Sequence, residues 1–578
     1  MKKQRNSKTC GRSISGQSPD KDYSAISQQK ETPSPSSPAR RRFLGQAGGA
    51  AATIAAGAVI GSPHARAQDG PIEVESVIGP VTGRKRQRQA FKLRVAAAQK
   101  ERDLAVADHP TNGDEEQYAN KIGNYSKGLP HNHLGEVNLT AYNGLIIALT
   151  SGSPADFENI AIAGDNKLTN PQSGLSFEMQ GPDTHCLTMR PAPAFSSAEE
   201  AAEIAENYWM ALLRDVPFSQ YGAHPLAAAA AEDLSHFSDF RGPKVNGQVT
   251  TDTLFRGLTP GDLTGPYISQ FLWLDTPFGV ERVERRMRTR AAGVDYLTDY
   301  DEWLAVQNGA VPGPGAFDPE RRYIRNGRDL AEWVHIDVLF QAYFNAMLIL
   351  KSLGAPRDAG NPYSNSRTQI GFATLGDPYC ASVLCAVPRP ALKAVWYQKW
   401  FVHRRLRPEE FAGRIHNHKR GVANYPIHTE ILSSVVLDLV EDQYDSCLLP
   451  MAFPEGCPTH PAYGAGHATV AGACVTFLKA FFDESFVIPH PVQATDDGLA
   501  LEPYTGPELT VGGELNKLAS NVALGRNIAG VHWRSDATES LKLGEEVAIR
   551  YMREEKECFN EQFGGLSLTK FDGTTITI

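Results

Sequence analysis

The sequence lacks the features that mark several large classes of protein. Outside the N-terminal region it has no run of about 20 apolar residues, so we expect no membrane-spanning helix. Its eight cysteines show no zinc-like pairing and are too sparse in 578 residues to form a disulfide scaffold. No fixed-period repeat interrupts the chain, and no long Pro/Ser linker divides it after residue 68. With 41% apolar and 21% charged residues, the bulk of the chain is typical of a globular protein.

The N-terminal region differs from the rest. Residues 1–39 are rich in Ser, Pro, Gln and Lys and cannot bury a core. Three arginines at 40–42 precede Phe43-Leu44, a weakly apolar stretch and the small residues around Ala67. This order predicts a twin-arginine signal peptide and disordered N-terminus over 1–67, and export to a periplasmic or extracellular location. A retained tethering helix is the alternative, although its glycines make it a poor bilayer span.

Removal of this signal leaves a strongly acidic chain. Residues 1–67 hold 11 of the 57 basic and 3 of the 66 acidic residues, so the remainder has 46 against 63, a net charge of −17. Such a surface disfavours nucleic acid and anionic membranes as partners. A local cluster of Lys and Arg residues in such an acidic chain therefore indicates a specific role for those residues.

Helical periodicity dominates the mature chain. Residues 329–353 place apolar side chains at spacings of three to four, and Gly354 ends the pattern. The sequence predicts further helices over 196–213, 390–411, 427–440, 467–482 and 515–528, with strands at 486–488 and 574–578. These elements predict a mainly α fold of packed bundles with few short strands.

Three segments of the C-terminal half collect cations and histidines. They are QKWFVHRRLRPE at 398–409, PTHPAYGAGHAT at 458–469 and GRNIAGVHWRSD at 525–536. Lys399 and Arg407 are eight residues apart, so both can point to one side of a helix. Arg526 and His532 are six apart across Gly530, which suits a helix end that turns over and brings both to one point.

Together these groups are suited to a bound oxyanion. Gly466-His467 opens a helix whose free backbone amides favour an anion. Guanidinium groups, a lysine charge and imidazole nitrogens complete the set that a tetrahedral or trigonal-bipyramidal oxyanion needs. Each piece alone is more often a solvated helix face or a structural histidine. Their occurrence in this order predicts an anion site.

The three segments resemble the signatures of the vanadium haloperoxidase and type 2 acid phosphatase superfamily. KWFVHRRLRPEEFAG and PEGCPTHPAYGAGHAT are most similar to the algal bromoperoxidases. So are NGDEEQYANKIGNYSKGLPHNHLGEV near residue 112, GPYISQFLWL near 265 and LTVGGELNKLASNVALGRNIAGVHWRSDA near 509. The resemblance covers roughly residues 85–555. It implies one haloperoxidase domain over 68–578, built as paired four-helix bundles, with the vanadate-binding half at about 385–555.

The resemblance also implies a role for each site residue. His532 would bond vanadium axially, and Asp536 would support that region. The vanadate oxygens would be held by Lys399, Arg407, Arg526 and the amide of Gly466. His467 would act as acid–base group, and Lys399 would polarise the oxygen that a halide attacks. His460 and Gln398 fall at positions linked with the halide.

The implied reaction is the oxidation of halide by hydrogen peroxide to a hypohalous acid equivalent that halogenates small organic acceptors. Bromide is the expected halide, with chloride possible. Vanadate is the implied cofactor, together with a structural calcium ion in some relatives, and a homo-oligomer of two or more copies is expected.

One position departs from the family pattern. The family usually has Ser-Gly-His in the second segment, whereas this chain has Ala465-Gly466-His467, preceded by Gly464 in place of Pro. One lost hydrogen bond to a charged group costs about 1.5–3 kcal/mol, which is about one to two orders of magnitude in vanadate affinity. We interpret the site as weakened or altered. Two alternatives stay open: a phosphomonoesterase with His532 as nucleophile, and a vanadate-independent relative that uses the same pocket.

Overall fold

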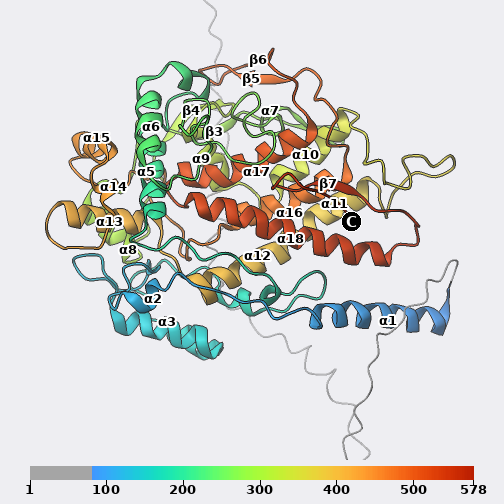
Figure 1. The fold of residues 1–578 in the computed structure, drawn as a ribbon, viewed down its shortest axis with the longest axis horizontal. Helices are drawn as coiled ribbons and strands as arrows, with labels where there is room; N and C mark the ends of the chain where they lie inside the picture. Colours follow the sequence, from blue (N-terminus) through green and yellow to red (C-terminus); the bar gives the residue numbers. More distant parts are fainter. Residues whose placement is uncertain (1–80) are drawn as a thin grey trace, which may run out of the picture. The chain divides into compact units, whose positions relative to one another are not determined.

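Helices form most of the regular structure in the computed structural model, which describes residues 81–578 (Figure 1). The first eleven α-helices are α1 (Gly83–Arg102), α2 (Asp114–Gln117), α3 (Leu139–Ser151), α4 (Pro154–Glu158), α5 (Ala198–Leu212), α6 (Pro225–His236), α7 (Gln270–Trp273), α8 (Tyr300–Gln307), α9 (Gly327–Ile336), α10 (Gln341–Ser352) and α11 (Asp377–Ala386). They are followed by α12 (Pro388–Tyr397), α13 (Pro408–Lys419), α14 (Thr429–Leu432), α15 (Val435–Tyr444), α16 (Gly466–Phe481), α17 (Val511–Ile528) and α18 (Arg534–Cys558). The predicted signal peptide lies outside the described residues.

Short helical turns and strands complete the described part of the chain. The turns are η3 (Pro171–Leu175), η4 (Thr184–Cys186) and η5 (Phe218–Ala223), and η6 (Gln398–His403) is a π-helix. Four antiparallel pairs join β1 (Thr276–Phe278) to β2 (Glu281–Val283), β3 (Met287–Arg290) to β4 (Phe317–Arg322), β5 (Val492–Ala494) to β6 (Leu501–Pro503) and β7 (Ser567–Thr569) to β8 (Thr575–Thr577). The mainly α prediction is confirmed, as is the strand at 574–578. The predicted strand at 486–488 was wrong, because that segment makes only an isolated bridge from Val487 to Thr510.

The helices that carry the second and third cation-rich segments pack together in the core. α16 lies against both α17 and α18 near the centre of Figure 1. α17 is buried on nearly all sides, as expected of an interior helix. Glycines let α16 and α18 approach closely: a Cβ on Gly544 would lie 1.9 Å from the Thr469 carbonyl oxygen, and one on Gly472 would lie 2.2 Å from that of Leu541. The predicted helices at 467–482 and 515–528 are confirmed.

The predicted helix at 329–353 is broken in the structure. α9 ends at Ile336 and α10 begins at Gln341, and the two helices are bent by 103°. Asp337 has extended backbone angles at the break, so its side chain leaves the helix surface. Apolar periodicity continues across the break because both helices bury the same kind of side chain, and for that reason the sequence pattern did not reveal it.

The predicted helix at 390–411 is also interrupted, and Lys399 and Arg407 therefore do not share one helix. α12 passes into the π-helix η6, and Arg404 then takes a left-handed conformation with φ of 42°. Arg407 is extended before Pro408, which begins α13. A residue before proline avoids the helical region, and proline suits the first turn of a helix. The prediction at 427–440 likewise becomes α14 and α15, with Ser434 capping α15.

The capped helix predicted at 196–213 is confirmed as α5. The Ser197 side chain accepts a hydrogen bond from the backbone N–H of Glu200. No single helix within residues 81–578 is both long and apolar enough to cross a membrane; α9 and α10 meet that criterion only as a bent pair.

Close contact between α16 and α18 predicts opposite effects for two glycine-to-alanine substitutions. We expect Gly544→Ala to lower the free energy of unfolding by about 1–3 kcal/mol, because its methyl group overlaps the backbone of α16. Gly144→Ala, in open space on α3, should raise it by up to about 1 kcal/mol through helix propensity. Urea unfolding of the two variants measures both. Equal effects from both substitutions would contradict the close contact.

Candidate active site

The second and third cation-rich segments meet at one cavity of about 350 Å³. Its walls are formed by His335, Leu339, Leu392, Trp396, Phe453, Glu455, Gly456, Pro458, His460, Gly466, His467, Arg526 and His532. Five of the residues singled out by sequence are among them. Lys399 and Arg407 are fully buried directly behind this wall, and both act electrostatically on His460 and His532.

Lys399 projects from the π-helix η6, a type of irregularity that is frequent at functional sites. Its Nζ donates to the carbonyl oxygens of Pro461 (2.8 Å) and Ala462 (3.1 Å), in the second segment. Burial and the neighbouring Arg407 lower the pKa of Lys399 well below its ordinary value. A nearby anion would favour the charged ammonium form.

Arg407 connects all three segments. Its Nε donates to the His460 carbonyl oxygen (2.9 Å), and Nη1 donates to the Val531 carbonyl oxygen (2.6 Å). The same guanidinium reaches two imidazoles: Nη2 lies 2.8 Å from His460 Nδ1, and Nη1 lies 3.0 Å from His532 Nε2. Because arginine only donates, both ring nitrogens act as acceptors here.

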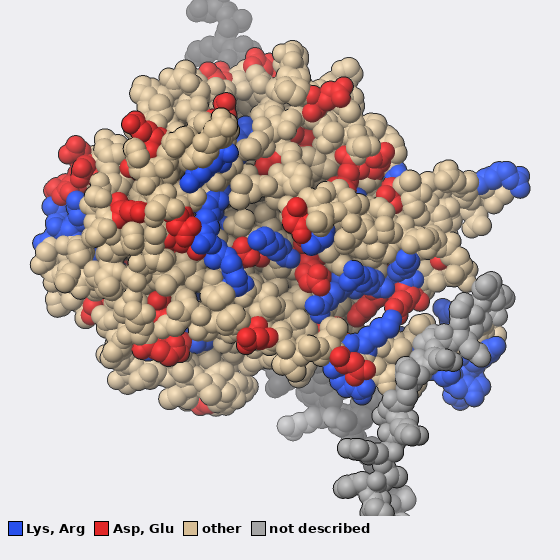
Figure 2. Space-filling view, in the orientation of Figure 1, with Lys and Arg blue, Asp and Glu red and all other residues tan. Residues whose placement is uncertain are grey.

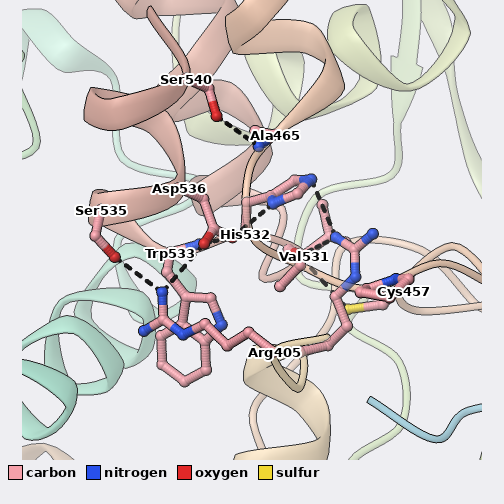
Figure 3. Close-up of polar contacts among 12 residues, drawn as sticks. Arg405, Cys457, Ala465, Val531, His532, Trp533, Ser535, Asp536 and Ser540 are labelled. Carbon is pink, nitrogen blue, oxygen red and sulfur yellow. Dashed lines mark hydrogen bonds and ion pairs between the residues drawn. The ribbon is translucent and has the colours of Figure 1, made fainter. Parts of the chain in front are cut away.

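His532 is consequently held in one tautomer. Its Nε2 accepts from Arg407, and its Nδ1 lies 2.7 Å from Asp536 Oδ2, so the proton is on Nδ1. Figure 3 shows Asp536 between His532 and the backbone of Trp533, whose N–H also donates to it (3.1 Å). Burial and the charges of Arg407, Lys399 and Arg526 lower the pKa of His532 well below its ordinary value. His532 is therefore neutral, with the Nε2 lone pair facing the cations.

His460 has the opposite tautomer. Its Nδ1 lies closer to the Arg407 Nη2 donor (2.8 Å) than to the Pro461 carbonyl oxygen (3.2 Å), so it accepts from Arg407 and the proton is on Nε2 of a ring that lines the cavity. The Trp396 ring packs against it with centroids 4.9 Å apart. Burial, Lys399 and Arg407 lower the pKa of His460 well below its ordinary value, so it is a neutral donor at the cavity wall. Gln398 does not line the cavity, because its Nε2 donates to the Leu187 carbonyl oxygen (2.9 Å). This placement favours His460 over Gln398 as the halide-site residue.

His467 is the one residue of α16 that is not buried. Its Nε2 lies 2.9 Å from Oδ1 of Asp337, the residue that the break between α9 and α10 releases. The sequence gave no signal for this partner, 130 residues away, because Asp337 fell inside the helix predicted at 329–353. An imidazole with a fixed carboxylate at an accessible cavity wall is suited to proton transfer.

Arg526 supplies a third cation with unused donor capacity. Its Nη1 donates to the Val334 carbonyl oxygen (2.8 Å), whereas its buried Nε has no partner within residues 81–578. Burial and Arg407 lower the pKa of Arg526 to about 10, against the opposing effect of Asp337. As expected, the chain turns over at Gly530, with φ of 85°, and brings Arg526 and His532 to the same cavity.

The departure at Ala465 lies at the start of α16. Ala465 is the N-cap residue and has no side-chain acceptor to offer, and its backbone N–H donates to Ser540 Oγ (2.8 Å; Figure 3). A Cβ on Gly464 would lie 2.1 Å from that hydroxyl oxygen. Gly464 therefore makes room for Ser540, and the two unusual residues belong to one local arrangement.

A buried network behind His532 was missed by sequence. Arg405 donates to Ser535 Oγ (2.8 Å; Figure 3) and to Asp536 Oδ1 (3.1 Å). It also donates to Glu203 Oε2 (2.8 Å) and pairs with Glu200. The two glutamates come from α5, which precedes Arg405 in sequence and is distant from it. This network fixes Asp536, and through it the orientation of the His532 ring.

A fourth histidine, which the sequence analysis missed, lies at the cavity wall. His335 Nε2 lies 2.6 Å from Glu455 Oε1, its Nδ1 lies 3.2 Å from Glu332 Oε2, and its ring stacks on Phe453 at 3.7 Å. Burial acts to lower the pKa of His335, but the two carboxylates outweigh it and raise the pKa above 6.5. His335 therefore offsets the charge of Glu455, the acidic residue that lines the cavity.

No further metal centre stands out in the described part of the chain. Residues 81–578 contain no group of three His, Cys, Asp or Glu side chains placed to hold a metal ion. The calcium expectation therefore has no assigned ligands.

Known proteins share both the sequence and this architecture. Residues 387–561 match the VCPO second helical-bundle domain. The vanadium-dependent bromoperoxidase of Corallina pilulifera is 36% identical over 85% of this chain and 98% of its own length, and that of Ascophyllum nodosum is 36% identical over 86% and 95%. The structure of the second vanadate-dependent bromoperoxidase of Ascophyllum nodosum, a homohexamer, superimposes with a TM-score of 0.82 at 32% identity, over 90% of this chain and 94% of that one. The chain belongs to the vanadium-dependent bromoperoxidase family.

Proposed function

We propose that the chain oxidises halide, bromide in the first place, with hydrogen peroxide in a vanadate-dependent reaction. Bromide loses two electrons, the O–O bond of the peroxide is broken, and one proton is consumed to give hypobromous acid and water. The product halogenates organic acceptors. The observation that carries the proposal is the neutral His532 imidazole: its Nε2 accepts from Arg407, and burial and the charges of Arg407, Lys399 and Arg526 lower its pKa.

The residues present fit a vanadate ion. Arg526 Nε is buried and has no partner in the described part of the chain, and Lys399 is a desolvated lysine; both favour an anion beside them. Lys399, Arg407, Arg526 and the Gly466 amide would hold its oxygens, and His532 Nε2 would bind the metal. When bound, vanadium in its highest oxidation state supplies Lewis acidity and a template for peroxide.

The protein's own groups then have separate tasks. Arg407 releases the His532 lone pair by turning its Nη1 donor to the anion, while its bond to the Val531 carbonyl keeps it in place. His467, oriented by Asp337, takes up and returns protons of peroxide at its exposed ring. His460 offers its Nε2 proton to the halide, and Trp396 packs on that ring and limits access of water.

Three further expectations accompany this proposal. The homohexameric relative supports a homo-oligomer of this chain. The arginine-rich N-terminus supports twin-arginine export to a periplasmic or extracellular location. A structural calcium ion remains part of the proposal on the ground of family resemblance.

Bromination of a phenol-type dye by the purified mature chain tests the function directly. With bromide and peroxide, we expect activity that appears only when orthovanadate is added. A folded protein that stays inactive at saturating vanadate would contradict the proposal. Hydrolysis of an aryl phosphate by that protein would then identify the phosphomonoesterase alternative, and the absence of bound vanadium would favour a vanadate-independent relative.

Restoring the hydroxyl at the departing position should strengthen cofactor binding. We expect Ala465→Ser to lower the Kd for vanadate by about 10- to 100-fold, from one added hydrogen bond to a charged group. The new N-cap should also stabilise α16 by about 1 kcal/mol. Reconstitution titrations and thermal unfolding measure the two effects. Ala386→Ser, exposed at the end of α11, is the control, and an unchanged Kd for Ala465→Ser would show that this hydroxyl does not reach the anion.

The charge of His335 and Glu455 at the cavity wall should make halide binding depend on pH. Below its raised pKa, His335 is protonated and offsets the charge of Glu455. Above that pKa, the Glu455 carboxylate loses this compensation, whereas Glu332 still pairs with Arg290. We therefore expect the KM for bromide to rise as the pH rises through the pKa of His335. Glu455→Gln should lower this KM by about two- to tenfold, a Coulomb effect of about 0.5–1.4 kcal/mol.

The same substitution should move the rise in KM to lower pH, because His335 loses one of its two carboxylate partners. Steady-state kinetics across pH, at saturating peroxide and vanadate, provide the measurement. Glu232→Gln, on the exposed face of α6, is the matched control. A pH profile of Glu455→Gln that superimposes on the unmodified protein would rule out this role for the pair.

A further inference from the structure

One buried ion pair beside the site takes no part in the proposed chemistry. Lys127 and Glu409 are 0% and 1% exposed, and Lys127 Nζ lies 2.5 Å from Glu409 Oε1. On the face shown in Figure 2, by contrast, charged side chains of both signs are interspersed at the surface. Removing two charges from water costs free energy that their attraction often does not recover, and apolar side chains can replace such a pair without loss of stability. Stability alone therefore does not account for this pair.

The pair joins segments that are far apart in the sequence. Lys127 lies between α2 and α3, whereas Glu409 is the second residue of α13, two positions after Arg407. Gln307, the last residue of α8, connects to both: its Nε2 donates to Glu409 Oε1 (3.2 Å), and its carbonyl oxygen accepts from the backbone N–H of Gly128 (2.8 Å). The two charges are thereby fixed in place directly behind the site.

Both members of the pair bind the backbone of a loop that forms part of the cavity wall. Lys127 Nζ donates to the carbonyl oxygen of Glu455 (2.7 Å), and the backbone N–H of Cys457 donates to Glu409 Oε2 (2.8 Å). Gly456, between them, has φ of 62°, and a Cβ there would lie 2.0 Å from Glu409 Oε2. Lys127 and Glu409 thus form a clamp on this turn, with one charge-assisted hydrogen bond on each side.

The clamped loop carries a carboxylate that sets the charge of the cavity wall. Glu455 Oε1 lies 2.6 Å from His335 Nε2, and both residues line the cavity. Two further charged groups face His335 Nδ1: a carboxylate oxygen of Glu332 at 3.2 Å and the Nη2 of Arg290 at 3.4 Å. These two lie on α9 and β3, away from the clamped loop. Glu455 is the charged neighbour of His335 that the clamp holds.

We propose that Lys127 and Glu409 are positioning residues of the active site, which hold the Glu455 carboxylate against His335 through the loop backbone. The Glu455 side chain is 37% exposed, so it can turn to water once its backbone is released. A carboxylate beside the imidazole favours the protonated form of His335, and its departure removes that effect. The consequence for bromide binding rests on the proposed function, whereas the consequence for His335 itself does not.

A variant without the clamp tests this role. It combines Lys127→Met with Glu409→Met, because replacing both partners leaves no unpaired buried charge. The control combines Lys517→Met with Glu514→Met, which removes an equally buried pair at the start of α17, at the opposite end of that helix from Arg526. Each protein is first shown to be folded by near-UV circular dichroism.

The pKa of His335 is the first readout, from an NMR titration of histidine-labelled protein without vanadate. Loss of a signal in His335→Gln assigns the resonance. We expect the pKa of His335 to fall in the clamp variant and to stay unchanged in the control. An unchanged pKa in the folded clamp variant would overturn the proposal, as would an equal fall in both variants.

A double-mutant cycle with Glu455→Gln shows whether the clamp acts through this carboxylate. Glu455→Gln should lower the pKa of His335 in the unmodified protein and change it little in the clamp variant, where the carboxylate has already moved away. Fully additive shifts would contradict the proposal. In kinetics, we expect the rise in KM for bromide with pH to move to lower pH in the clamp variant and to keep its place in the control.

Amide hydrogen exchange provides a measurement that does not require a folded variant. In the unmodified protein we expect the Cys457 amide to exchange at least about 10- to 100-fold more slowly than in an unstructured peptide, from its hydrogen bond to a charged group. Exchange at the peptide rate would overturn the clamp. The NMR and exchange measurements use no vanadate, so they stand even if the proposed function fails. Vanadate-dependent bromination together with an unchanged pKa of His335 in the clamp variant would overturn the clamp alone.

Discussion

The guanidinium of Arg407 is the interaction on which the rest of the site depends. It joins the start of α13 to the carbonyl of His460 and to the carbonyl of Val531. Through the same planar group it sets the tautomers of two imidazoles, leaving a lone pair on His532 and a proton on His460. A lysine in this position would lack the fork of donors that makes four contacts at once.

Burial of so many cations requires compensation elsewhere. Asp536 lies between the cation cluster and Arg405, which in turn holds Glu200 and Glu203. Burial raises the pKa of Glu200 well above its ordinary value, with Arg405 opposing it. Cationic and acidic side chains therefore alternate from the cavity to α5, and the carboxyl groups offset part of the positive charge of the buried site.

Particular residues show what the sequence could predict. The spacing across Gly530 was sufficient to place Arg526 and His532 at one point, because that geometry is local. Asp337 and Arg405 gave no such signal. Asp337 lay within a continuous apolar pattern, and the partners of Arg405 come from a helix more than 200 residues earlier. The helix predicted at 390–411 ran across Pro408, where α13 begins, and the left-handed turn at Arg404 before it is unusual for a residue other than glycine.

The breaks in the helices have a consequence for the order of folding. The site is closed by contacts between residues 53, 125 and 130 positions apart, whereas each helix forms from local contacts. Closing a long loop lowers the conformational entropy of the chain before the new contact stabilises it, and a high contact order therefore slows folding. When the chain refolds, its helix content should recover early, and the anion pocket should be among the last parts to assemble. The chemistry is thereby restricted to chains that have completed their tertiary structure.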